Sequence, residues 1–116
     1  MIINIKATNI EMTDALKEYA HEKAESLEKY FKDIQKIDVD FGMDNHHHQK
    51  GKVYQAQMNV FVPGKVLTIS KKAEDLYKAI DKVKDHLKTE LDELKDRMRK
   101  KDRNEIRNAK GYQEEE

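Results

Sequence analysis

The sequence contains no cysteine, which excludes a disulfide framework, a thiolate zinc site and a cysteine nucleophile. No apolar run approaches the ~18 residues that a membrane span requires. Met1 leads into a short β-branched stretch instead of the basic start and apolar run of a signal peptide. We therefore expect a cytoplasmic protein with no membrane partner.

An excess of charge of one sign is also missing, because 23 Lys and Arg balance 23 Asp and Glu. A role in nucleic-acid binding must therefore depend on where the cations lie rather than on their number. Catalytic motifs are missing as well: the chain has no serine elbow, no glycine-rich phosphate loop and no HExxH sequence. The sequence predicts a protein that is not an enzyme and that uses no cofactor and no small-molecule substrate.

The 116 residues fit one domain, whose hydrophobic pattern has the order β-α-β-β-β-α. The predicted elements are strand 2–8, a helix capped by Thr13 that runs to about Phe31, strand 37–43, strand 53–62, strand 66–69 after a Pro63-Gly64 turn, and a helix from about Glu74. Three consecutive strands imply an antiparallel meander, which the first strand should join. Since the strands alternate and each helix has one apolar stripe, we expect an α+β two-layer sandwich, with both helices on one face of a four-stranded sheet.

The apolar stripe of the last helix stops at Met98, although no helix breaker appears before Gly111. We therefore expect a domain over residues 1–98 and a charged extension over 99–116, which projects as exposed helix or tail and is flexible. Seven basic residues but only two acidic ones lie between Arg97 and Lys110. The cations are thus concentrated near the C-terminus.

Many of these cations share one side of the predicted helix. They are Lys84, Lys88, Lys95, Arg99, Arg103 and Arg107. Like charges four residues apart destabilise an isolated helix by about 0.2–0.5 kcal/mol per pair. An anion such as a phosphate backbone would relieve that repulsion. The alternative is a solvated face, since helix C-termini favour cations.

Three adjacent histidines, His46, His47 and His48, lie in the polar stretch 44–51. Imidazole is a common metal ligand, but adjacent positions in a loop preset no coordination geometry. No cysteine or carboxylate motif accompanies them. We therefore favour a polar loop with incidental metal affinity over a resident metal site.

The segment Glu74-Asp75-Leu76-Tyr77-Lys78-Ala79-Ile80-Asp81 is close to the motif "D(M/L)Y-x-AID". Residues 12–31 match the pattern "(I/M)T-x-AL(R/K)-x-(Y/F)…K…LE-x-(Y/F)F". Over about residues 1–100 the chain thus resembles the ribosome hibernation promoting factor and ribosome-associated inhibitor (protein Y) family. We expect Tyr77 to anchor the start of its helix against the sheet rather than to stack on a base.

The resemblance implies a fold akin to a double-stranded-RNA-binding domain. It also implies a translation inhibitor that occupies the tRNA and mRNA sites of the small ribosomal subunit and contacts its rRNA. Off the ribosome the protein is expected to be a monomer. By position in the family pattern, Lys17 and Lys23 contact RNA from the first helix, and Lys95, Arg97 and Arg99 from the second. With the basic side of the last helix, the candidate RNA-binding residues are Lys17, Lys23, Lys84, Lys88, Lys95, Arg97, Arg99 and Arg103.

The chain departs from the family where His86, Thr89 and Glu93 replace usual cations of the second helix. Lys84 and Lys88 are expected to compensate, one step away on the helix. Because the basic side also extends to Arg107, the centre of the basic surface is expected to lie nearer the C-terminus. Two alternatives stay open. One is a diverged member that binds another RNA or a protein through its basic C-terminal helix, and the other is a metal-binding module built on the histidine loop.

Overall fold

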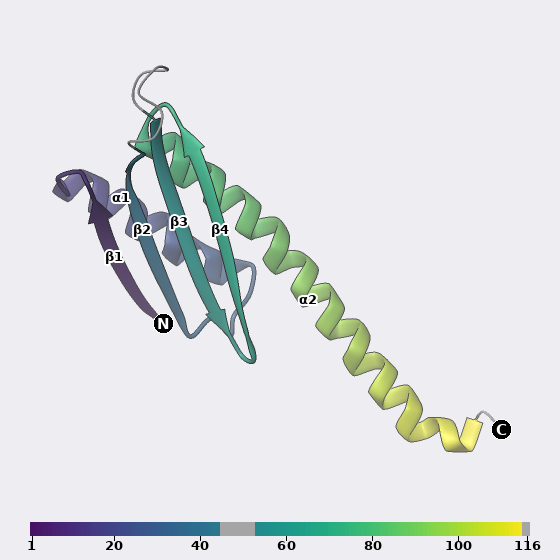
Figure 1. Ribbon diagram of the computed structural model, residues 1–116. Helices are drawn as coiled ribbons and strands as arrows, with labels where there is room; N and C mark the ends of the chain where they lie inside the picture. The colour runs from purple at the N-terminus through teal and green to yellow at the C-terminus, as the bar shows by residue number, and fades with distance from the viewer. Residues whose placement is uncertain (45–52, 115–116) are drawn as a thin grey trace.

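The computed structural model describes residues 1–44 and 53–114, so the histidine loop lies outside the described residues. The elements are β1 (Ile2–Thr8), α1 (Asp14–Ser26), a 3₁₀ turn η1 (Leu27–Lys29), β2 (Lys36–Asp44), β3 (Val53–Val62), β4 (Lys65–Ala73) and α2 (Leu76–Glu114). Figure 1 shows the sheet with both helices behind it. The predicted β-α-β-β-β-α sandwich is confirmed.

The four strands lie in the order β1-β2-β3-β4. The pairs β2–β3 and β3–β4 are antiparallel, as expected for a meander, whereas β1 is parallel to β2. A parallel pair needs a long crossover connection, and α1 supplies it. Because α1 connects the parallel strands β1 and β2, it crosses the sheet and lies against one face of it.

The core lies between the sheet and the helices, where the alternating side chains of the strands meet the helical stripes. Ile37, Val39 and Phe41 of β2 are buried. They face the buried Val60, Met58 and Ala56 of β3 in register. The opposite face is polar, as the side-chain hydrogen bond of 3.0 Å from Asn4 of β1 to Asp38 of β2 illustrates. One face of the sheet is thus covered and the other is open.

The contact between β1 and β2 depends on a glycine. Gly42 is paired with Thr8, and a Cβ added at Gly42 would collide with the carbonyl oxygen of Thr8. Gly64 has a φ of 75°, which the turn between β3 and β4 requires and which glycine adopts without strain. Both glycines therefore fix how neighbouring strands meet.

Two predicted elements had the wrong length. The first helix is capped as expected, since the Leu16 N–H donates to Thr13 Oγ1 at 3.1 Å, but α1 ends at Ser26 and a 3₁₀ turn follows. Ser26 Oγ donates to the Lys23 carbonyl at 2.7 Å, a side-chain bond of the kind that competes with helical hydrogen bonding. Strand β4 extends to Ala73, beyond its apolar pattern, because its backbone pairs with β3 as far as Tyr54.

Helix α2 leaves the domain in its second half (Figure 1). Leu91 is buried, Leu94 is half-buried and Met98 is 41% exposed, so packing against the sheet ends where the apolar stripe ends. The backbone continues as helix to Glu114, and the molecule measures 66 × 29 × 18 Å. The flexibility expected of residues 99–116 stays a prediction. Among the described residues, none of the helices is sufficiently long and apolar to span a membrane.

Candidate nucleic-acid interface

The predicted basic side of α2 is a compact strip in the structure. At about 100° per residue, Lys84, Lys88, Lys95 and Arg99 fall within about 60° of one another, roughly 90° around the helix from the buried Leu87. We call these four residues the basic flank. None of them forms an ion pair within the part of the chain whose side chains are described.

The basic flank borders the side of the domain that carries α1 and η1. The Nζ atom of Lys88 lies 5.3 Å from the ring centroid of Tyr30, which directly follows η1. Lys95 and Arg99 line a hollow together with Phe31 and Lys32. The flank therefore forms one wall of a groove between α2 and the segment around η1.

At the other end of this groove, α1 and α2 are joined by an aromatic and ionic cluster. Tyr19 donates a hydrogen bond of 2.6 Å to Asp81 Oδ1. This bond raises the pKa of Tyr19 to about 12, because ionising the phenol would remove the donor beside a carboxylate. Lys23 Nζ lies 3.6 Å from the same oxygen and 5.2 Å from the Tyr19 ring centroid. The carboxylate thus binds two side chains of α1.

Tyr77 also belongs to this cluster, and its predicted packing against the sheet was wrong. Its ring meets that of Tyr19 edge-on, with centroids 4.8 Å apart, and the residue is 42% exposed. Tyr77 lies on the side of α2 that faces α1, about 80° around the helix from Leu87. The segment that resembles the family most closely therefore serves to hold the two helices together.

The remaining candidate residues do not join the basic flank. Arg97 lies about 200° around α2 from Lys95, on another side of the helix. On α1, Lys17 and Lys23 lie about 120° apart; the ion pair with Asp81 places Lys23 on the side towards α2. Arg103 lies one turn beyond the flank, outside the residues whose side chains are described. The RNA-binding role of every candidate stays a prediction.

Three positions where the family resemblance leads us to expect cations form a separate side of α2. His86, Thr89 and Glu93 fall within about 60° of one another, but about 140° around the helix from the centre of the basic flank. One step along a helix is a rotation of about 100°, so Lys84 and Lys88 do not restore charge at the same place. The basic flank thus lies on another side of α2 than these three positions.

The exposed side of α1 is acidic, a feature that sequence reasoning missed. The acidic side chains on this side are the exposed Glu18, Glu22 and Glu25 of α1 and Glu28 of η1. Their spacing of four, three and three residues marks one helix face and could have revealed it. Because like charges repel, this face is unsuited to a phosphate backbone. The groove and the basic flank of α2 are therefore better suited to a phosphate backbone than this face of α1.

The metal module receives no support from the described residues. Within residues 1–43 and 53–101, whose side chains are described, no group of three His, Cys, Asp or Glu side chains could hold a metal ion. The three loop histidines lie outside this range, so the hypothesis that involves them stays untested.

Comparison with known proteins identifies the class of this protein. Residues 3–99 match the family described as "Sigma 54 modulation protein / S30EA ribosomal protein", and the chain belongs to this family. Its curated relatives are named ribosome hibernation factors, and this family is not enzymatic. The expectation of a non-enzymatic protein is thereby confirmed.

The share of each relative that this chain matches differs from one relative to another. The ribosome hibernation promoting factor of Escherichia coli (strain K12) is 30% identical over 99 residues, which are 85% of this chain and 98% of that protein. The ribosome hibernation promotion factor of Lactococcus lactis subsp. cremoris (strain MG1363) is 30% identical over 105 residues, 89% of this chain and 54% of that protein. The chain thus spans about half the length of the Lactococcus relative.

Solved structures share the fold. The Thermus thermophilus protein Y N-terminal domain is 28% identical, with a TM-score of 0.70 over 81% of this chain and 99% of that one. A ribosomal subunit interface protein from Coxiella burnetii, at 22% identity, has a TM-score of 0.71 over 82% of this chain and 98% of that one. The two-layer sandwich is therefore the architecture of these domains.

Proposed function

We propose that this protein is a ribosome-binding hibernation factor that places its basic flank against ribosomal RNA. The observation that carries the proposal is the flank itself, whose four cations lie on one side of α2 without an ion pair among the described side chains. The names of the relatives, which are ribosome hibernation factors, support the choice of the ribosome as partner.

Electrostatics explains why an anionic partner suits this surface. The repulsion between cations one turn apart falls when phosphates neutralise them, and counterions released from the RNA favour binding further. The acidic face of α1 restricts the orientation, because it must point away from the phosphates. The protein would then approach RNA with its groove and α2 first.

We further propose that the bound protein occupies the tRNA and mRNA sites of the small subunit. The resemblance to hibernation factors supports this placement, and the projecting α2 gives the chain an elongated shape suited to a channel in a larger particle (Figure 1). Inhibition would be steric and without turnover. The protein would act as a monomer off the ribosome and as a blocking ligand on it.

A diverged member that binds another RNA is the second candidate. The observation that favours it is that His86, Thr89 and Glu93, where the family resemblance leads us to expect cations, lie on another side of α2 than the basic flank. Binding to a purified small subunit separates the two candidates, because only the hibernation factor must bind that particle.

The test is co-sedimentation with purified small ribosomal subunits across a salt series. We expect binding that weakens steeply with salt, with a log–log slope of about −0.7 to −0.9 per phosphate contacted. The double reversal Lys88→Glu and Lys95→Glu should weaken binding about 100-fold and flatten this slope by about two, since each residue is expected to contact one phosphate.

The matched control is Lys82→Glu with Lys100→Glu, which changes the charge equally but on another side of α2. These two residues lie about 130° around the helix from the centre of the basic flank. We expect this control to retain most of the binding. A larger loss in the control than in the flank variant would show that the wrong side of α2 was assigned, and absence of binding at low salt would contradict the proposed function.

A further inference from the structure

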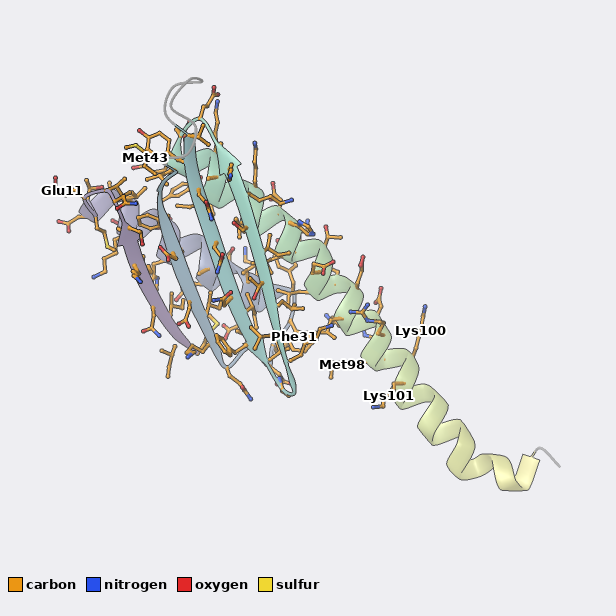
Figure 2. The ribbon with its side chains drawn as sticks, viewed as in Figure 1. Glu11, Phe31, Met43, Met98, Lys100 and Lys101 are labelled. Carbon is orange, nitrogen blue, oxygen red and sulfur yellow. The ribbon has the colours of Figure 1, made fainter. Side chains whose placement is uncertain are left out.

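A hollow of about 400 Å³ lies at the point where α2 leaves the domain. One wall is the segment after η1, with Phe31, Lys32 and Asp33, and the other is α2, with Lys95, Met98 and Arg99. Figure 2 shows Phe31 beside α2 at the lower end of the sheet and Met98 at the adjoining part of the helix. The hollow is within the roughly 300–1,000 Å³ range of small-ligand sites.

The apolar part of this hollow comes from two side chains. Phe31 is only 6% exposed and belongs to the core, so it forms a fixed floor. Met98 is 41% exposed, one of five large hydrophobic residues left open among the described side chains. A flexible, polarisable thioether beside an aromatic ring adapts to flat ligands of varied shape.

The polar part consists of three cations and one carboxylate. Lys32, Lys95 and Arg99 form no ion pair among the described side chains, and neither does Asp33. Two lysines and a planar guanidinium suit a phosphate group, which a guanidinium can bind through two parallel hydrogen bonds. The Asp33 carboxylate accepts hydrogen bonds, as from the exocyclic amino group of a nucleobase.

We infer that this hollow binds one unpaired nucleotide of RNA, with the base against Met98 and Phe31 and the phosphate on Lys32, Lys95 and Arg99. This inference rests on the proposed RNA-binding function and adds that the hollow binds an unpaired nucleotide of that RNA. A paired base stays stacked in its helix and shows no face to such a site, whereas an unpaired base can be splayed out and stacked on a protein side chain. The site would thus select single-stranded over duplex RNA.

The charges also argue against a peptide ligand. The carboxylates of an acidic peptide would use the three cations, but its acidic side chains offer no donor to Asp33, which only a backbone N–H could then satisfy. A nucleotide uses both signs, since its phosphate is an anion and its base carries N–H donors. The combination of apolar lining, three cations and one acceptor therefore fits a nucleotide better than an acidic side chain.

The inference is tested on the full chain with methyl-¹³C methionine, by recording the Met98 methyl signal during titration with RNA. The two probes are a short single-stranded RNA of mixed sequence and a blunt duplex that contains the same sequence. We expect the Met98 signal to shift with the single strand and to stay in place with the duplex. The buried Met58 supplies an internal control for global change.

A variant adds an affinity measurement. Met98→Ala should weaken binding of the single strand about tenfold, as expected for the loss of one base contact, and leave duplex binding unchanged. Helix α2 should persist, because Met98 is exposed and alanine is a strong helix former. The control Val66→Ala trims another exposed apolar side chain, on β4, and should change neither affinity.

The outcomes separate the inference from the proposed function. Single-stranded RNA that binds without moving the Met98 signal, or a duplex that moves it equally, overturns the nucleotide site and leaves ribosome binding intact. Loss of small-subunit co-sedimentation by the wild-type chain contradicts the proposed function, whichever result the methionine signal gives.

Discussion

The two helices of this protein cover the same face of the sheet but present opposite charges to solvent. Each helix buries one apolar stripe, through Leu16, Ala20 and Ala24 in α1 and through Val83, Leu87 and Leu91 in α2. The exposed side of α1 carries glutamates, whereas the side of α2 next to the groove carries the basic flank. The difference shows that the stripe serves the fold, while the charge of the remaining surface is free to serve a partner.

The largest effects should come from the stripes, where the two helices are alike. Leu87→Ala in α2 and Leu16→Ala in α1 each remove a buried side chain and should lower the free energy of unfolding by about 2–5 kcal/mol. Urea denaturation followed by circular dichroism measures this quantity. A cost confined to one helix would break the equivalence and show that the other helix is not needed for stability.

A smaller effect is expected where the helices are joined. Tyr19→Phe removes the hydrogen bond to Asp81 and should destabilise the protein by about 1 kcal/mol at neutral pH. Since the pKa of Tyr19 rises from 10.0 to about 12 on folding, its contribution is complete below pH 10 and is lost as the pH rises towards 12. The difference in stability between wild type and Tyr19→Phe should therefore shrink over that interval.

Urea denaturation of both proteins at several pH values measures this difference. A gap that stays constant from pH 9 to about pH 12 would mean that folding does not raise the pKa of Tyr19. A stabilised Tyr19→Phe variant would show that the hydrogen bond is not what joins the helices.

The smallest effect is expected on the acidic face. Glu22→Lys with Glu25→Lys reverses two charges on the exposed side of α1, and we expect affinity for the small subunit to change less than about threefold at 0.15 M salt, because screening limits charges that point away from the RNA. Co-sedimentation at that salt concentration measures it. A large gain in affinity would show that α1 contacts phosphate, and that the two helices do not differ in this respect.

Much of the fold could be predicted because its signals are local. Alternation in Ile37, Val39 and Phe41 identified a strand, and the regular spacing of the apolar stripes identified both helices. The early end of α1 at Ser26, where the side chain bonds to the Lys23 carbonyl, was missed. The length of β4 was missed because pairing with β3 decides it. The contact of Tyr77 with Tyr19 was also missed, because the two residues lie far apart in the sequence.

The candidate site shows the same division. Spacing along one helix was sufficient to predict the basic flank, since its four members lie on a single element. It was not sufficient to identify the hollow, because Lys32 and Asp33 come from the other side of the groove and carry no motif. Nor could it show that Lys23 shares the carboxylate of Asp81 with Tyr19, 62 residues away along the chain from that aspartate.

The sequence by itself determined the elements, their apolar faces and the family, because each of these depends on residues that are close together in the chain. The tertiary structure decided the parallel pairing of β1, the junction of Tyr19 with Asp81, and the side of α2 on which the cations meet the groove. These features depend on how α1 crosses between two strands and on which face α2 buries. The physical reason is that packing sets the rotation of each helix and the pairing of each strand. These in turn determine which charged side chains lie together on the surface.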